Sequence, residues 1–292
     1  MSIKPYATNL FCSFCCLLYS SSFMFIPSGA AETLTLFQAT ESNSQYLDGL
    51  IKMALAESAT HYQYNNELIP TYMARDLQLL EQGRLSVYWT TATIELEQAY
   101  RPIRIPLFRG LLGYRILLIR KGQQQKFDKM KTIDDLRDIS LGQGQDWTDT
   151  RILEANGLNV VKSIKYQTLF HMLDGGRFDA FPRGLQEPWN EISAHPNLEL
   201  AVEKNILIIY KMPFYLFVTK NNEKLAQDLE YGLRQIIEDG SFNEYFFNYP
   251  TIKKTLEQVN IKNRIEIKLD NPFLSTETPV DKPELWFDLH DL

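Results

Sequence analysis

The sequence predicts an α/β fold with mostly parallel sheets, arranged in two lobes. Short apolar runs alternate with segments whose apolar residues recur at helical spacing, from residue 33 to about residue 238. Strands that alternate with helices in this way pair mostly in parallel. A polar break at residues 121–126 follows a long apolar run at residues 111–120, and we expect the chain to cross there into a second lobe.

The composition is that of a globular protein. The chain has 292 residues, of which 45% are hydrophobic and 23% are charged, which is enough to bury one or two cores. Its formal net charge is −6. Nucleic-acid binding depends on a basic surface that displaces phosphate counterions, so this acidic balance argues against a nucleic-acid partner.

Residues 1–31 differ from the rest of the chain. Lys4 is their only charged residue, and an apolar run at residues 10–26 leads into a short series of small residues. We expect a secretory signal that is cleaved near Ala30 or Ala31. A membrane anchor is the alternative, because the run is nearly long enough to span a bilayer.

All three cysteines, Cys12, Cys15 and Cys16, lie in this segment. The mature chain then has no cysteine and needs no disulfide framework. Lipidation is disfavoured because none of the three follows a small residue. The later apolar runs are too short to predict a transmembrane helix.

The elements of the first lobe follow from the pattern in order. Residues 33–37 alternate as in a strand, and residues 46–59 have helical spacing. A second helix is expected at residues 73–82, where Gly83 ends it, and residues 85–89 form the next buried strand.

The second lobe repeats the alternation with short units. Helices are expected at residues 132–137, 148–155 and 166–173, and strands at residues 140–142, 159–163 and from 179 to 181. Strands at residues 206–210 and 214–219 and a helix at residues 223–238 then return the chain to the first lobe. Residues 271–292 have little periodicity and are expected to form an extended surface segment.

Four motifs occur in a fixed order along the chain: TIDDLR at residues 132–137, LGQGQDWTDT at 141–150, LDGGRFDA at 173–180 and IEDGSFNEY at 237–245. This series resembles the bacterial extracellular solute-binding proteins of family 3, the polar amino-acid-binding kind. The resemblance covers nearly all of the mature chain. It implies the type 2 periplasmic-binding-protein fold, in which two crossover strands join two lobes, a ligand cleft lies between them, and a hinge closes on the ligand.

The resemblance also implies a domain division and a function. Residues 1–31 are the signal peptide, residues 32–118 and 214–292 form the first lobe, and residues 119–213 form the second. We expect a monomeric periplasmic protein that captures a small polar ligand, with an anionic group as one option, for the permease of an ABC transporter. A stand-alone periplasmic sensor that signals to a membrane receptor is the alternative.

The first lobe offers a threonine-rich turn as a ligand site. In the family a TxTxER pattern grips the ligand carboxylate; here the stretch WTTATIELE begins at Trp89 and lacks the arginine. We expect Trp89, Thr90 and Thr91 to contact the ligand. Arg101 and Arg104 lie farther on and could replace the missing arginine, although solvated arginines with no such role are the simpler interpretation.

The second lobe offers Arg183, which stands where the resemblance places a ligand-binding aspartate after the GRxDA unit. A guanidinium at a strand end suits a carboxylate, phosphate or sulfate. An internal ion pair between Arg183 and Glu187 is the alternative.

The turn before the predicted helix at residues 148–155 adds three candidates. Gln145 and Thr148 lie where backbone amides and a hydroxyl would face an anionic or carbonyl group. Trp147 and Trp89 could stack on a flat ligand, or could lie in a core. Arg109 is a further candidate, and weaker ones are Glu41, Tyr46 and residues 166–170.

Nothing in the motifs predicts catalysis. The four histidines are scattered without metal-ligand spacing, and the chain has no GxSxG or Walker-type loop. We therefore expect no metal and no cofactor, and an enzyme derived from this fold is the least favoured reading.

The signal-like segment leads to a prediction for the expressed protein. Cleavage after residue 30 or 31 should release a soluble monomer, because the later apolar runs are short. Mass spectrometry of the amino terminus and size-exclusion chromatography test it. Recovery of the uncut chain in the membrane fraction would contradict it.

Overall fold

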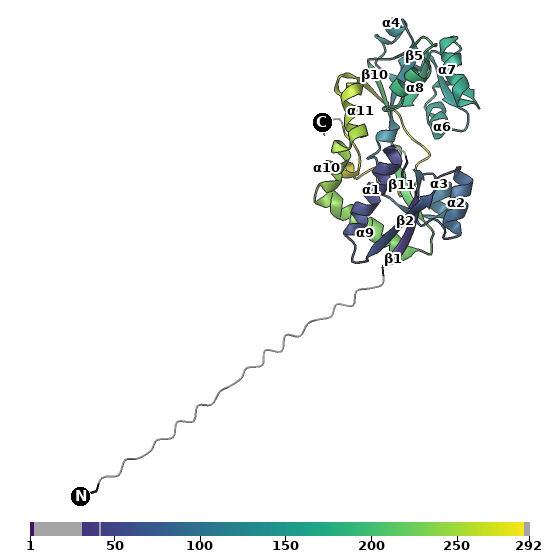
Figure 1. Ribbon diagram of the computed structural model, residues 1–292. Coiled ribbons are helices and arrows are strands. Elements are labelled where there is room, and N and C mark those ends of the chain that lie inside the picture. Colours follow the sequence, from purple (N-terminus) through teal and green to yellow (C-terminus); the bar gives the residue numbers. More distant parts are fainter. Residues whose placement is uncertain (3–30, 41, 289–292) are drawn as a thin grey trace. The chain divides into compact units, whose positions relative to one another are not determined.

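The structure is a computed structural model that describes residues 1–2, 31–40 and 42–288 (Figure 1). The expected signal segment lies almost entirely outside the described residues, and so does Glu41. Residues 1–30 and 31–292 form separate units, and the fold below is that of the second unit. None of the helices in the described ranges is long and apolar enough to cross a membrane.

The first lobe contains a two-stranded and a three-stranded sheet. In the first sheet β1 (Glu32–Phe37) pairs in parallel with β2 (Tyr62–Leu68). In the second sheet β11 (Phe214–Val218) lies between β3 (Tyr88–Thr91) and β4 (Arg101–Ile103) and runs antiparallel to both. The helices of this lobe are α1 (Ser42–Ala56), α2 (Met73–Glu81), α3 (Ile94–Ala99), α9 (Glu223–Glu238), α10 (Ser241–Asn248) and α11 (Pro250–Val259).

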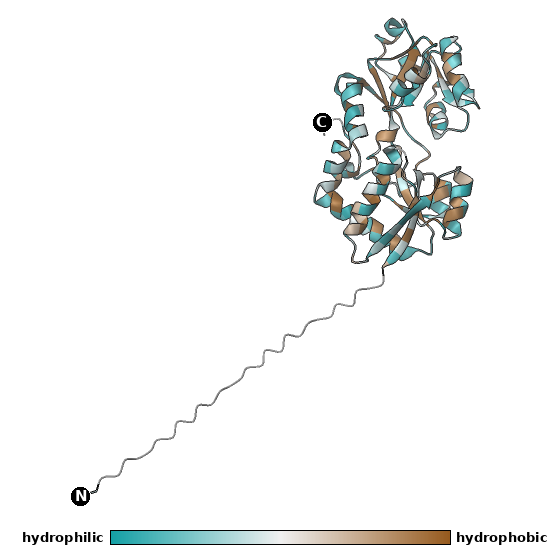
Figure 2. Ribbon diagram, viewed as in Figure 1, coloured by the Kyte–Doolittle hydropathy of each residue, from teal (hydrophilic) through white to brown (hydrophobic). Residues whose placement is uncertain are grey.

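The second lobe is built on a seven-stranded sheet in the order β12-β10-β5-β8-β6-β7, with β9 also paired to β5. Its central strand reads YRILLIR and is buried along almost its whole length. Figure 2 shows brown, hydrophobic strands in this lobe. The strands are β5 (Tyr114–Arg120), β6 (Ser140–Gly144), β7 (Asn159–Ser163), β8 (Ala180–Gly184), β9 (Leu200–Val202), β10 (Ile206–Ile209) and β12 (Ile265–Lys268). The helices are α4 (Gln124–Phe127), α5 (Ile133–Arg137), α6 (Thr148–Ala155), α7 (Tyr166–Asp174) and α8 (Pro188–Ala194).

The alternation of strands and helices is confirmed, and several elements match their expected bounds. The helices α6 and α9 begin and end where the sequence predicts. The expected lobe boundary differs: the division at residues 118/119 falls inside β5, which pairs along its length with strands of the second lobe. The strand β12, expected in the first lobe, pairs in parallel with β10.

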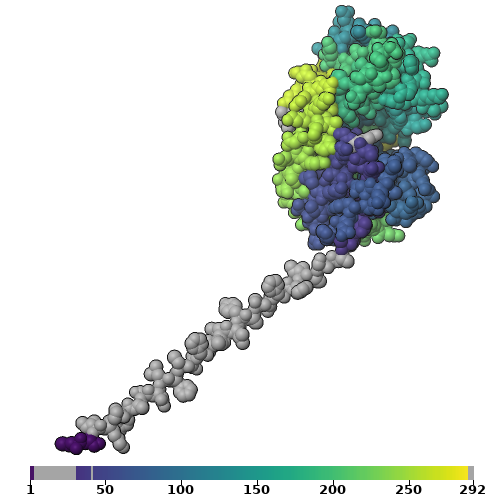
Figure 3. All heavy atoms as spheres, in the orientation of Figure 1, coloured from purple at the N-terminus to yellow at the C-terminus, as the bar shows by residue number. Residues whose placement is uncertain are grey.

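The C-terminal strap, residues 270–288, contacts both lobes. At its start the Asp270 amide donates to Asn156 Oδ1 at 3.1 Å, next to α6 of the second lobe. Farther on Glu277 forms an ion pair of 2.5 Å with Arg104, which follows β4 of the first lobe. Figure 3 shows the yellow-green part of the chain, where α10 and α11 lie in Figure 1, against purple residues of the first lobe and teal residues of the second. The strap therefore forms a connection between the lobes in addition to the two expected crossovers.

The strap ends in a buried anchor, in contrast to the expected surface segment. Trp286 and Phe287 are each 3% exposed, and the Trp286 indole donates to the Pro279 carbonyl at 2.8 Å. Gly110 has a φ of 74°, and a Cβ there would lie 2.5 Å from the Trp286 ring. The Phe287 amide donates to the Arg109 carbonyl at 2.6 Å. Gly110 lies in residues 104–113, the crossover that joins β4 of the first lobe to β5 of the second. Because Gly110 has no side chain, the Trp286 indole can pack on this crossover.

Removal of this anchor should destabilise the protein. Trp286→Ala is expected to lower the free energy of unfolding by about 3 to 5 kcal/mol, because it leaves a large cavity beside the crossover. Urea denaturation measures it. Tyr231→Ala, at a ring that is 54% exposed, is the control and should change the value by less than about 0.5 kcal/mol. Equal losses in the two variants would contradict the role given to Trp286.

Candidate ligand face of the second lobe

The second lobe gathers charged side chains at the carboxyl end of β8 and the amino end of α6. In open α/β sheets, ligands bind outside the carboxyl ends of the strands. Arg183 lies on β8, and Trp147 is the residue that precedes the first turn of α6. We call this group of side chains the ligand face.

Arg183 is held in internal ion pairs. Its Nη2 lies 2.6 Å from Glu191 Oε1 and 3.1 Å from Glu187 Oε2, and its Nε donates to Glu191 Oε1 at 2.8 Å. The residue is only 6% exposed. The alternative weighed for Arg183, an internal ion pair with Glu187, is therefore present, and Glu191 is a second partner. The guanidinium charge of Arg183 is balanced by these two carboxylates inside the protein.

Three aromatic rings enclose the Arg183 guanidinium. Its central carbon lies 4.7 Å from the Phe181 ring centroid, 5.1 Å from that of Trp147 and 5.4 Å from that of Tyr166. Cation–π contacts of this kind gain strength as the cation loses water. The Tyr166 hydroxyl donates to Glu191 Oε1 at 2.6 Å. Burial and this bond to a carboxylate together raise the pKa of Tyr166, so the hydroxyl stays a donor.

A second buried arginine, Arg115, extends the network. Its Nη2 lies 2.6 Å from Asp149 Oδ1 on α6, and its Nε donates to the Tyr210 hydroxyl at 3.0 Å. The Tyr210 hydroxyl in turn donates to Asp149. Burial alone would lower the pKa of Arg115, but Asp149, Tyr210 and Glu187 together outweigh burial and raise it. Arg115 was not predicted as a site residue, although an arginine inside an otherwise apolar strand is a recognisable signal.

Glu187 joins the two arginines and is the most exposed member of the network. Its Oε2 accepts a hydrogen bond of 2.6 Å from the Gly184 amide and lies 4.0 Å from Arg115 Nη1. A Cβ at Gly184 would lie 3.0 Å from Glu187 Oε2, so glycine allows this close approach. The Glu187 side chain is 34% exposed, whereas that of Arg183 is 8% exposed. The network holds two cationic and three acidic side chains, and its accessible charge is the carboxylate of Glu187.

The other candidates of the second lobe are placed as follows. Trp147 is half-buried and stacks on Phe181, with ring centroids 6.2 Å apart. Thr148 is the first residue of α6, as predicted, and is half-buried. Gln145 is exposed, and its amide donates to the Ser163 carbonyl at 3.0 Å, so that amide is already occupied.

The first-lobe candidates lie together on another sheet. Trp89, Thr90 and Thr91 form the end of β3 and are all half-buried. The Trp89 ring meets Phe37 edge-on at 5.4 Å, so part of the indole packs against the core. The turn continues into α3, where the Thr93 hydroxyl accepts a bond from the Leu96 amide and begins the helix.

The structure places Arg109 against the C-terminal strap. Its side chain is 4% exposed, donates from Nη2 to the Trp286 carbonyl at 3.3 Å, and lies 5.5 Å from the Phe247 ring centroid. Arg109 therefore holds the C-terminal strap. Tyr46 is also a core residue, since it is 1% exposed and its hydroxyl donates to the Leu107 carbonyl. Within the described ranges, no group of three His, Cys, Asp or Glu side chains could hold a metal ion.

The ion pairs of Arg183 should make it a stability residue. Arg183→Met is expected to cost about 3 to 5 kcal/mol of unfolding free energy, because it leaves Glu191 buried without its partner. The double variant Arg183→Met with Glu191→Met should lose less than the sum of the two single losses. Urea denaturation of all four proteins gives the coupling. Additive losses would mean that the two side chains do not depend on each other.

The comparisons with known proteins support the fold. No family model and no curated protein matches the chain. Among solved structures, the chain is similar to the probable amino-acid ABC transporter extracellular-binding protein ytmK from Bacillus subtilis, with 16% identity and a TM-score of 0.54 over 76% of this chain and 99% of that one. It is also similar to the second substrate-binding domain assigned to an amino acid ABC transporter from Streptococcus pneumoniae, with 13% identity and a TM-score of 0.50 over 75% of this chain and 99% of that one. The chain therefore has the two-lobed α/β fold of the substrate-binding proteins of amino-acid ABC transporters.

Proposed function

We propose that this protein is the solute-binding component of an ABC transporter and captures a small polar molecule between its two lobes. The fold supports this role, because the two solved structures described above are binding components assigned to amino-acid transporters. The ligand face also supports the proposal. It places an accessible carboxylate at the carboxyl end of β8, where ligands of such sheets bind.

The charge of the ligand face favours a ligand with a cationic or hydrogen-bond-donating group. Arg183 and Arg115 are each paired with carboxylates, so neither offers a free positive charge. Glu187 remains 34% exposed and can accept a further hydrogen bond. A ligand that carried only negative charge would meet Glu187 unfavourably. We therefore infer an amino-acid-like solute whose ammonium group faces Glu187, and the option of a purely anionic ligand loses its support.

The opposite end of such a ligand suits the first-lobe turn. Thr90 and Thr91 carry hydroxyls at the end of β3, and the half-buried Trp89 beside them offers a flat apolar surface. Hydroxyl donors of this kind hold a carboxylate or carbonyl oxygen without adding a charge. The two ends together would select a small zwitterion by size and by polarity.

A binding experiment tests this proposal. The mature protein is screened against the common amino acids and small amines by thermal shift, and hits are measured by calorimetry. Glu187→Gln should weaken binding of the best ligand by about 30-fold or more, because it removes the charge and keeps an acceptor for the Gly184 amide.

The control is Glu199→Gln, at a carboxylate that is 74% exposed and forms an ion pair with Lys121 at 3.2 Å. This variant should bind with wild-type affinity. If dicarboxylates or phosphates bind in place of zwitterions, or if Glu187→Gln binds as well as the wild type, the assigned role of Glu187 is wrong.

A further inference from the structure

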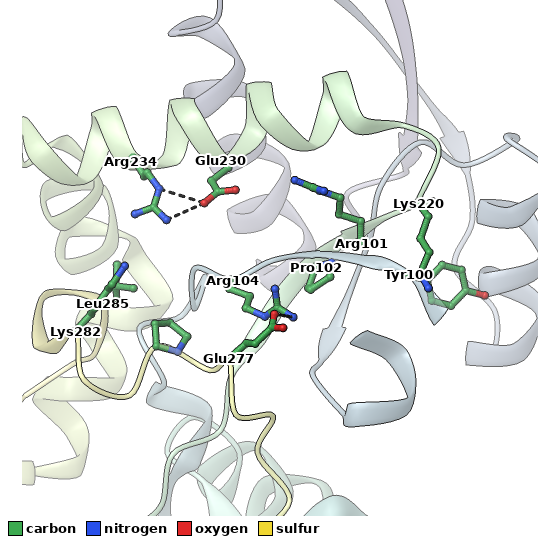
Figure 4. A pocket seen from close by; sticks show the side chains of 11 residues that line it. Tyr100, Arg101, Pro102, Arg104, Lys220, Glu230, Arg234, Glu277, Lys282 and Leu285 are labelled. Carbon is green, nitrogen blue, oxygen red and sulfur yellow. Dashed lines mark hydrogen bonds and ion pairs between the residues drawn. The ribbon is translucent and has the colours of Figure 1, made fainter. Parts of the chain in front are cut away.

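Five of the eleven residues that line a hollow away from the ligand face are basic. It lies between β4, the helix α9 and the C-terminal strap and has a volume of about 550 Å³ (Figure 4). Three separate stretches of chain form its wall, so it depends on the folded protein. The cationic side chains at its surface are Arg101, Arg104, Lys220, Arg234 and Lys282.

The acidic side chains of the hollow are already neutralised. Glu230 accepts two hydrogen bonds from Arg234, at 2.7 and 3.3 Å, as Figure 4 shows. Glu277 of the strap lies 2.5 Å from Arg104, and this arginine also pairs with Glu97 at 2.8 Å. Arg104 and Arg234 therefore add little net positive charge to the hollow, but their N–H groups remain hydrogen-bond donors.

The remaining three cations carry the positive charge. Lys220 and Lys282 have no acidic partner within ion-pair distance in the part of the chain that the structure describes. Arg101 lies 3.8 Å from Glu223, but their side chains are 39% and 64% exposed, so solvent screens that pair. With five cationic and two acidic side chains, the lining has an excess of three positive charges.

This excess stands out against the charge of the whole chain. The protein as a whole has a formal net charge of −6, of opposite sign to this lining. A concave wall also concentrates the field of the charges that line it, more than a flat surface does. The ammonium groups of Lys220 and Lys282 share the lining with Arg101, and a bound anion would relieve the repulsion among these three cations.

We propose that this hollow is a second binding site, which takes a small soluble anion with two or more negative charges, such as a phosphorylated or polycarboxylate compound. Lys220 and Lys282 approach the anion as point charges from opposite walls, and Arg101 adds a planar guanidinium. Because Lys282 belongs to the strap and Lys220 follows β11, the anion fixes the strap to the first lobe. None of these residues belongs to the ligand face, so this site does not depend on the transport role.

Calorimetry with inorganic pyrophosphate as the probe tests the site, on the whole mature protein at constant ionic strength. We expect one saturable site, and no comparable binding of acetate. The double variant Lys220→Gln with Lys282→Gln should weaken pyrophosphate binding by roughly 100-fold, because each substitution removes one charge-assisted hydrogen bond to the anion.

The matched control is Lys129→Gln with Lys204→Gln, which removes the same charge from exposed positions outside the hollow. It should leave the affinity within about threefold of the wild type. Thermal unfolding verifies that both double variants fold. If a double variant does not fold, its two single lysine variants are measured in its place.

Three results would overturn the proposal. They are the absence of saturable pyrophosphate binding, equal weakening in both double variants, and binding to vesicles of phosphatidylglycerol and phosphatidylcholine without binding of pyrophosphate. The last result would mean a lipid surface in place of a soluble anion. Binding of amino acids at the ligand face is measured separately and decides none of these outcomes.

Discussion

Two arginines buried in the second lobe must be neutralised, and the arrangement of the ligand face follows from that need. A buried guanidinium without a partner would cost several kcal/mol, so each needs carboxylates at hydrogen-bonding distance. Arg115 takes Asp149 from α6, and Arg183 takes Glu191 from α8. The first turn of α6 and the whole of α8 are thereby fixed against the sheet. Glu187 pairs with Arg183 and stays accessible, because the other partners already balance the charge.

The sequence predicts those features that depend on neighbours along the chain. Helical spacing and the turn at residues 145–148 locate α6, and the alternation of elements identifies the fold class. The strand β2 was missed because its sequence, YQYNNEL, is polar and does not alternate cleanly. It is held in place by parallel pairing with β1, which is a contact between distant parts of the chain.

The charge balance of the candidate site could not be predicted in the same way. The position of Arg183 was identified from its motif, but its partner Glu191 is eight residues away on a helix whose packing the pattern does not give. Arg115 reaches Glu187 because β5 and β8 pair antiparallel with Arg115 opposite Gly184. The register of strands 69 positions apart in sequence leaves no local signal. The periodicity of the sequence also did not predict how the strap packs, because a single buried residue such as Trp286 leaves no repeating pattern.

The position of that anchor determines when the fold can be completed. The contact between Arg109 and Trp286 spans 177 residues, and the bond from Tyr114 to the Phe287 carbonyl spans 173. Contacts this distant in sequence form late, because a long loop must close before they add any stability. A ribosome delivers residues 285–287 long after residue 110, so until then the crossover at Gly110 keeps an unfilled apolar surface. The nascent chain thus stays incompletely folded, and open to chaperones, until residues 285–287 emerge.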